Sequence, residues 1–250
     1  MKNFVNSQSP AFSTRTQRSG ESMDIIEQLI TAAIKGDQDQ VEGLLAQGAD
    51  VNGLGRGNTT ALMWASAEGY LDIVNTLIAR GADVNLSNDA NYTALMYAAE
   101  SNYRDIIKIL IEQGADIHVR NRYGETILMS AARKGYTDIV QLLIDKGTQI
   151  HATNNIGDTA LYLAADNGQT NTINLLLEHG ADVNTQNIGG WTPLMMAAAR
   201  GDIDAIALLL EHGADVNVKN RWGGTPLAEA RKSFHPYQAV ELLIRAGATE

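Results

Sequence analysis

The five-residue sequence Gly-Ala-Asp-Val-Asn recurs in this chain, and the spacing of its copies constrains the fold more than any other feature. Complete copies begin at Gly48, Gly81, Gly180 and Gly213, and degenerate copies begin at Gly114 and Gly147. All six starts fall at intervals of 33 residues. A chain that repeats one corner at a fixed period is built from one structural unit stacked on itself.

Each unit contains a threonine that precedes a short apolar run. These threonines are Thr60, Thr93, Thr126, Thr159, Thr192 and Thr225. A threonine hydroxyl can accept hydrogen bonds from the free backbone amides at the start of a helix. In the first five of these units a Gly or Asn follows nine residues later, where a left-handed residue would end the helix. A second apolar run comes next, with Ile73, Val74 and Leu77 at helical spacing in one unit. Each unit is therefore expected to be a pair of short antiparallel helices.

A nine-residue link joins each unit to the next and is expected to form a hairpin-like finger. Its seventh residue is always Gly or Asn, as a turn with positive φ requires, at Asn58, Asn91, Gly124, Gly157, Gly190 and Gly223. One helix pair cannot bury its apolar stripe alone, so neighbouring units must stack. The sequence predicts an all-α solenoid of helix-turn-helix units with β-hairpin-like fingers, with about seven repeats including the caps.

The domain organisation follows from where the repeat begins and ends. Residues 23–250 are predicted to form the repeat domain, with caps at about 23–52 and 225–250. The last unit carries polar Glu229, Arg231 and Lys232 in its inner helix, as a solenoid end requires. Residues 1–22 are rich in Ser, Thr and Gln and show no helical period, so we predict a disordered N-terminal tail. A targeting sequence is the alternative, because this segment is rich in Ser and Arg and poor in acids.

The 33-residue period, the Thr-Pro/Ala-Leu start, the Ala-Ala pair and the Gly-Ala-Asp-Val-Asn exit together resemble the ankyrin repeat family. The resemblance covers residues 24–250. It implies an elongated, slightly curved stack. The fingers and first helices would line a concave face, and the second helices would form the convex back.

The sequence departs from the ankyrin pattern at the fourth residue of the start motif, which is usually His in that family. Here the position holds Met63, Met96, Met129, Tyr162, Met195 and Ala228. Thioether packing is expected to replace the hydrogen bonds of that His, because Met fills irregular gaps well. We interpret these methionines as core residues and not as a metal or cofactor site.

The composition argues against several classes of function. A formal charge of -10 disfavours binding to nucleic acids or anionic membranes, and no apolar run approaches the length of a membrane span. The chain contains no cysteine, which excludes disulfides, Cys-based zinc sites and Cys nucleophiles. With no apolar N-terminal stretch resembling a signal peptide, we predict a cytoplasmic monomer with no nucleic-acid binding and no membrane insertion.

The histidines and aspartates recur in register and do not form catalytic or metal-binding groups in the sequence. Stacked helices lie about 8–10 Å apart, so His118 and His151 are too far apart for an easy shared zinc ion. The corner aspartates, such as Asp50 and Asp83, are expected to bond the local backbone. No phosphate loop or nucleophile motif is present. We predict no enzymatic activity, no catalytic residue, no metal and no cofactor.

Function is expected at the positions that the repeat leaves free. These are the fifth, sixth and eighth residues of each link and the exposed end of each first helix. Basic residues slightly outnumber acidic ones there, although the whole chain is acidic. Since Arg and aromatic residues are enriched in binding hot spots, we predict a partner-binding face formed by Arg56, Tyr92, Arg122, Tyr123, Arg133, Lys134, Trp191, Arg200, Arg221 and Trp222. Trp64 and Tyr97 are expected to support it from the inner helices.

Structural explanations stand beside these functional ones. Trp191 and Trp222 could pack on a neighbouring finger, and Trp64 and Tyr97 could simply fill the core or the groove. Our first hypothesis is a non-enzymatic adaptor that binds another protein on its concave face. The alternatives are a structural or regulatory subunit of an enzyme or secretory complex, a spacer whose fingers bind nothing, and an enzyme. Nucleic-acid binding ranks last.

Overall fold

The computed structural model describes residues 24–233 and 236–249, so the predicted tail at 1–22 lies outside the described residues. Within these ranges the chain forms fourteen α-helices and one short 3-10 helix, η1 (Arg56–Asn58). The first helices of the units are α1 (Ile25–Lys35), α3 (Ala61–Glu68), α5 (Ala94–Glu100), α7 (Ile127–Lys134), α9 (Ala160–Asp166), α11 (Pro193–Arg200) and α13 (Pro226–Ala230). The second helices are α2 (Gln38–Ala46), α4 (Leu71–Ala79), α6 (Arg104–Glu112), α8 (Thr137–Asp145), α10 (Thr170–Glu178), α12 (Ile203–Glu211) and α14 (Pro236–Arg245).

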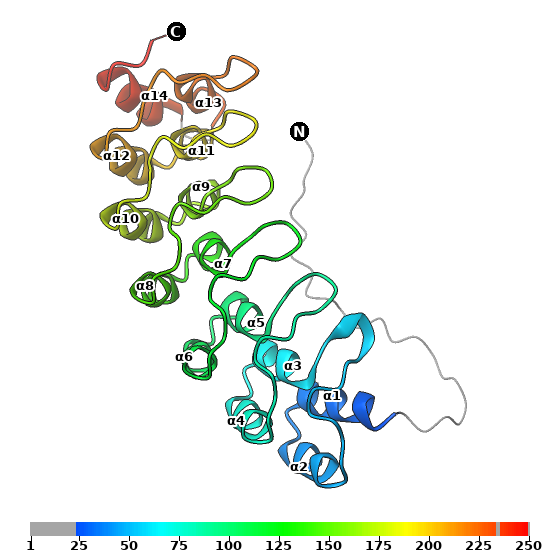
Figure 1. Cartoon of the computed structure of the whole chain (residues 1–250). Helices are drawn as coiled ribbons and strands as arrows, with labels where there is room; N and C mark the ends of the chain where they lie inside the picture. The colour runs from blue at the N-terminus through cyan, green and yellow to red at the C-terminus, as the bar shows by residue number, and fades with distance from the viewer. Residues whose placement is uncertain (1–23, 234–235, 250) are drawn as a thin grey trace.

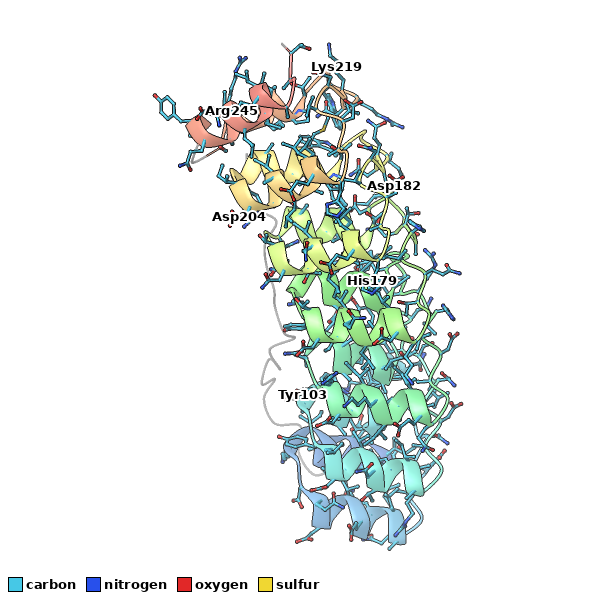
Figure 2. The ribbon with its side chains drawn as sticks, turned by 90° about the vertical axis from the view of Figure 1, so that its left-hand side faces the viewer. Tyr103, His179, Asp182, Asp204, Lys219 and Arg245 are labelled. Atoms are coloured by element: carbon cyan, nitrogen blue, oxygen red, sulfur yellow. The ribbon has the colours of Figure 1, made fainter. Side chains whose placement is uncertain are left out.

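The seven helix pairs stack into a curved solenoid. The first helices form an inner row, the second helices form an outer row, and the fingers project on the concave side of the curve (Figure 1). Figure 2 shows the opposite side, where the outer helices lie side by side and form the back of the stack. In the described residues the only β-pairing consists of two isolated bridges, one at the base of each of two fingers: Ser87 pairs with Thr93, and Arg120 pairs with Thr126. The predicted all-α solenoid with hairpin-like fingers is therefore confirmed.

The threonine at the start of each unit caps the inner helix, as the sequence predicted. The Thr60 hydroxyl accepts a hydrogen bond from the backbone N–H of Met63 at 3.2 Å. The same contact begins α5, α7, α9, α11 and α13. At the other end of α5, Asn102 adopts a φ of 65° where the equivalent positions of other units carry glycine. Local capping by each unit's own residues thus fixes the length of these short helices.

The core runs continuously between the two rows of helices. Met63, Met96, Met129 and Met195 are all buried among inner helices, which confirms their interpretation as core residues. The Ala-Ala pair lies where neighbouring inner helices approach one another, and in α3 the second alanine is replaced by Ser66. The Ser66 hydroxyl is fully buried and has no hydrogen-bond partner among the described residues.

The repeated corner ties each unit to the next one. Within a corner, the Asp50 carboxylate accepts from the Asn52 backbone N–H at 2.9 Å, and the other corner aspartates make the same bond, so their predicted local role is confirmed. Between units, the Asn52 side-chain amide donates to the Gly81 carbonyl at 3.2 Å and its carbonyl accepts from the Asp83 N–H at 2.8 Å. Asn85, Asn184 and Asn217 make equivalent paired bonds to the following corner.

Two corners in the middle of the stack lack this clamp. His118 and His151 occupy the position of the clamping asparagine. Throughout the described ranges, no hydrogen bond joins either imidazole to the next corner. The central junctions of the solenoid are therefore held by apolar packing and by the fingers, without the paired bonds found toward both ends.

Candidate functional site

An asparagine at the fourth link position braces each of the last five fingers. The Asn121 side-chain carbonyl accepts from the backbone N–H of Tyr123 at 2.9 Å and of Glu125 at 3.0 Å. Asn88, Asn154, Asn187 and Asn220 make the same two bonds in their own fingers. This role was not predicted from the sequence, although the recurrence of Asn at the 33-residue period was a visible signal for it.

Neighbouring fingers are joined by one backbone hydrogen bond at each junction. The fifth link residue of one finger donates to the sixth link residue of the preceding finger: Asp89 to Gly57, Arg122 to Ala90, Asn155 to Tyr123, Ile188 to Ile156 and Arg221 to Gly189, at 2.9–3.0 Å. The backbone of the finger tips is therefore held in a regular row. The side chains at these two positions are not needed for that connection.

The eighth link residue is not part of the exposed tips, which corrects the sequence prediction. Tyr92, Glu125 and Trp191 are half-buried and Asp158 is buried at this position. The Tyr92 hydroxyl donates to the Glu100 carboxylate on α5 at 3.1 Å. Each finger folds back over the inner helix of its own unit. The eighth link residue therefore lies between the finger and the C-terminal end of that helix, where Tyr92 contacts Glu100 and Glu125 contacts Arg133.

Large apolar side chains stand exposed at the tips of four consecutive fingers. Tyr123, Ile156, Ile188 and Trp222 expose between 52% and 75% of their surface. We call these four residues the finger-tip row. Ile156 and Ile188 were not among the predicted binding residues, and they connect Tyr123 with Trp222 along the stack. Two adjacent fingers toward the N-terminus carry only Gly57 and Ala90 at the sixth position.

Arginines accompany the finger-tip row at both ends. Arg122 is exposed, and its guanidinium lies 5.1 Å from the centre of the Tyr123 ring. Arg221 is exposed beside Trp222, whose ring centre lies 6.5 Å from that of the half-buried Trp191. Trp191 thus packs on the neighbouring finger, as its structural interpretation proposed, while most of Trp222 remains open to solvent.

The inner helices carry an aromatic group near the N-terminal half of the concave face. The rings of Trp64 and Tyr97 stack with their centres 6.2 Å apart, and Tyr92 lies 5.5 Å from Tyr97. Burial, together with the nearby Glu100 carboxylate, raises the pKa of Tyr92 to about 12. The pKa of Tyr97 is raised as well, so both hydroxyls are neutral near neutral pH; that of Tyr92 donates to Glu100, and that of Tyr97 accepts from the Asn88 amide.

Charged groups in the centre of the concave face are paired in one unit and unpaired in the next. In the third unit with a threonine start, Arg133 forms an ion pair with Glu125, which the Asn121 amide also contacts. The equivalent positions in the next unit hold Asp158 and Asp166. Burial raises the pKa of both carboxyls; the negative charge of Glu125 adds to the rise at Asp158, and that of Asp158 adds to the rise at Asp166.

The remaining predicted binding residues are spread along the concave side. Arg56 is exposed, with its Nε 3.9 Å from a Glu27 carboxylate oxygen. Lys134 is exposed at the end of α7. Arg200 is exposed at the end of α11 and donates to the Asp166 backbone carbonyl at 3.0 Å. Among the ten predicted residues, exposed basic and aromatic side chains are neighbours at the finger tips, Arg122 with Tyr123 and Arg221 with Trp222.

The described residues form exposed surfaces and grooves, and their ionisable side chains are not gathered into a metal-binding group. Among the residues that the structure describes, no group of three or more His, Cys, Asp or Glu side chains is placed to hold a metal ion. His179 and Asp182 lie along one edge of the back of the stack (Figure 2). Over the same described ranges, no helix is both long and apolar enough to cross a membrane.

Comparisons with known proteins agree with this architecture. The family model described as ankyrin repeats (3 copies) matches residues 29–121 and 95–187, and a second model, ankyrin repeats (many copies), matches residues 176–230. The crystal structure of the human ASB11 ankyrin repeat domain superposes with a TM-score of 0.76 at 25% sequence identity, covering 89% of this chain and 98% of that chain. No curated protein matches the sequence significantly.

Ankyrin repeats are in general protein–protein interaction modules, and proteins built from them are typically non-enzymatic and mostly intracellular. The two matches of the first family model together span more than half of the chain. The capped helix pairs, the linked fingers and the clamped corners of the described residues provide the structural counterpart of those matches. This chain belongs to the ankyrin repeat family.

Proposed function

We propose that this chain is a non-enzymatic adaptor that binds a partner protein along the finger-tip row and the adjoining concave face. The observation that carries the proposal is the row itself. Scattered exposed apolar residues are common on soluble proteins, but contiguous ones with nearby Arg indicate an interaction surface. Tyr123, Ile156, Ile188 and Trp222 occupy consecutive fingers, and because the hydrogen bonds that join these fingers are made by backbone atoms, their side chains stay largely exposed.

The predicted binding residues contribute to this surface in two ways. Arg122, Tyr123, Arg221 and Trp222 belong to the exposed tips and would contact the partner directly. Tyr92, Arg133, Trp191 and Arg200 contact other side chains or the backbone of the stack and would shape the concave face beside the tips. Arg56 and Lys134 extend the basic character of the face toward its edges.

The proposal is tested with a photo-crosslinking amino acid placed at Ile156 in the full chain, expressed in its source cells. The matched control carries the same amino acid at Asn75, which is exposed on outer helix α4. We expect a discrete covalent protein adduct from position 156 that is absent from position 75. The substitutions Tyr123→Ser and Trp222→Ser should abolish this adduct, whereas Leu54→Ser, at an equally exposed apolar residue outside the row, should not.

Other results would contradict the proposal. The same adducts from positions 156 and 75 would show that the fingers have no particular role. Turnover of a substrate by the purified chain would favour an enzyme. A discrete adduct to one enzyme would support the second candidate, a regulatory subunit that uses the same surface.

We also propose that the chain is a cytoplasmic monomer, which sedimentation analysis and cell fractionation would test.

A further inference from the structure

One junction of the described stack is packed less closely than the others. It lies between the pair α5–α6 and the pair α7–α8, in the middle of the solenoid (Figure 1). Among neighbouring outer helices, α6 and α8 approach each other least, and among neighbouring inner helices the same is true of α5 and α7. Helix length does not explain the difference, because α9 is as long as α5 and packs closely on α7. We call this place the α6–α8 junction.

Glycine in the turn between paired helices lets neighbouring units approach closely. Gly36 and Gly69 occupy this turn with φ angles of 72° and 85°, and a tyrosine of the next unit lies over each of them. A Cβ atom on Gly36 would lie 2.6 Å from the Tyr70 ring, and one on Gly69 would overlap the Tyr103 ring. Tyr70 and Tyr103 directly precede α4 and α6. Their packing on glycine therefore brings each outer helix against the one before it.

The α6–α8 junction cannot pack in this way, because its turn contains asparagine. Asn102 adopts the same left-handed conformation, with a φ of 65°, but carries the side chain that the two glycines lack. Tyr136, which directly precedes α8, therefore cannot lie over the turn as Tyr70 and Tyr103 do. Its hydroxyl instead donates to the Glu100 backbone carbonyl at 3.5 Å. The asparagine side chain thus gives a physical reason for the separation of α8 from α6.

The corner of the same junction also lacks its clamp. His118 stands in place of the asparagine that would bond the Gly147 corner. At the next junction His151 makes the same replacement, but there the Thr137 and Thr172 hydroxyls hydrogen-bond at 3.0 Å and α8 packs on α10. Among the described residues, the α6–α8 junction is therefore where the packing on glycine and the corner clamp are both missing.

The finger side of the α6–α8 junction stays connected. The Arg122 backbone N–H donates to the Ala90 carbonyl at 3.0 Å, and the Asn121 amide donates to the Tyr92 hydroxyl at 3.1 Å. The bonds across this junction thus lie on the concave side of the stack, while the outer helices on the back are loosely packed. A stack that is bonded on one side and loose on the other can bend about the bonded side.

We propose that the α6–α8 junction is a hinge that divides the solenoid into two rigid bodies, with the finger at residues 118–125 as the pivot. Bending changes the separation of α6 and α8 and, with it, the curvature of the concave face. The aromatic group of Trp64, Tyr92 and Tyr97 lies before the hinge, and the finger-tip row begins at the hinge and continues after it. The hinge angle therefore sets how these two surfaces face each other. The hinge does not depend on whether the finger-tip row binds a partner.

The test measures distances across the hinge in the full chain. Because the chain contains no cysteine, two introduced cysteines can be spin-labelled selectively. The exposed residues Asp72, Asp138 and Asp204 occupy equivalent positions on α4, α8 and α12. The pair Asp72→Cys with Asp138→Cys spans the hinge, and the control pair Asp138→Cys with Asp204→Cys spans the same number of units without it. Two helix spacings correspond to about 20 Å, a separation that double electron–electron resonance can follow. We expect the distance distribution across the hinge to be about twofold broader than that of the control pair.

A double variant links the hinge to its cause. Asn102→Gly with His118→Asn restores the glycine and the clamp found at the preceding junction. It should narrow the distribution across the hinge to the width of the control pair and leave the control pair unchanged, with circular dichroism verifying that each variant is folded. Equal widths for the two pairs in the unmodified background would overturn the proposal. So would a broad distribution across the hinge that the double variant does not narrow, because Asn102 and His118 would then not be its cause.

Discussion

The weakest junctions of this solenoid are predicted to be the two that lack a clamping asparagine. The substitution His118→Asn should restore one clamp, with the new amide donating to the Gly147 carbonyl and accepting from the Gln149 N–H. His151→Asn should do the same with Gly180 and Asp182. The geometry already exists in the chain, where Asn85 makes this pair at 3.0 and 2.8 Å. The imidazoles they replace are exposed, so little packing is lost.

The size of the effect follows from two hydrogen bonds gained per substitution. One intramolecular hydrogen bond contributes about 0.5–1.5 kcal/mol net, and exposed corners belong at the lower end of that range. Each substitution should therefore stabilise the chain by about 1 kcal/mol, and the two together by about 2 kcal/mol because they share no partner. For a chain of this length, 1 kcal/mol corresponds to a shift of roughly 2–4 °C in Tm.

Urea denaturation monitored by circular dichroism and by tryptophan fluorescence gives the comparison. Trp64 lies on one side of the two junctions, and Trp191 and Trp222 lie on the other, so fluorescence reports on both halves of the stack. If the middle is weak, the two probes should differ in the unmodified chain and converge in the double variant. The reverse substitution, Asn85→His, should cost about 1 kcal/mol. If neither the His→Asn substitutions nor Asn85→His changes the free energy of unfolding, the asparagine clamp does not stabilise the corners.

Three further changes are predicted from the described residues. Ser66→Ala should raise the free energy of unfolding by about 1 kcal/mol, because it removes a buried hydroxyl without a partner; a lower Tm in thermal unfolding would contradict this. Arg133→Ala should destabilise the chain by about 1–2 kcal/mol in denaturant titration, because Glu125, with 12% of its side chain exposed, would lose its cation. Asp166→Asn should stabilise the chain at pH 7 but not at pH 3. Because the folded pKa of Asp166 is raised, the native state binds more protons and stability falls as pH rises through that pKa. Denaturation at both pH values, with an equal gain at each as the contrary result, checks this prediction.

The fold could be predicted from the sequence because each of its determinants is local and repeated. Thr60 and its equivalents cap helices through bonds to residues three positions away, and the corner aspartates bond two positions away. Contacts over such short separations are fixed by residue type and spacing. The clamp made by Asn52 spans 31 residues, but it is visible in the sequence as the period itself.

The candidate site could be predicted only in part. The eighth link residue was expected at the tip, and it lies against the inner helix because the finger folds back on its own unit. The contact of Tyr92 with Glu100 and that of Glu125 with Arg133 both span eight residues, a separation that no local rule of the sequence indicates. Ile156 and Ile188 occupy different link positions, so no periodic signal groups them, and only the backbone row of the fingers places them in one line.

The difference between positions that the repeat specifies and positions that it leaves free explains why the finger-tip row indicates function. Most positions that the stack requires are occupied by residues suited to that role: Thr for the cap, Asn for the finger brace, and alanine in the inner helices. At the fifth and sixth link positions the hydrogen bond that joins neighbouring fingers is made by backbone atoms, although the side chains of Asp89 and Asn155 add one hydrogen bond each. In four consecutive units one of these two residues is nevertheless large, apolar and exposed, namely Tyr123, Ile156, Ile188 or Trp222, and exposing such groups to water costs free energy. The Trp222 ring contacts Trp191 but keeps 75% of its surface exposed, and Ile156 keeps 58% of its surface exposed. Contact with a partner would offset that cost, and we therefore propose the finger tips as the surface where a partner should be sought.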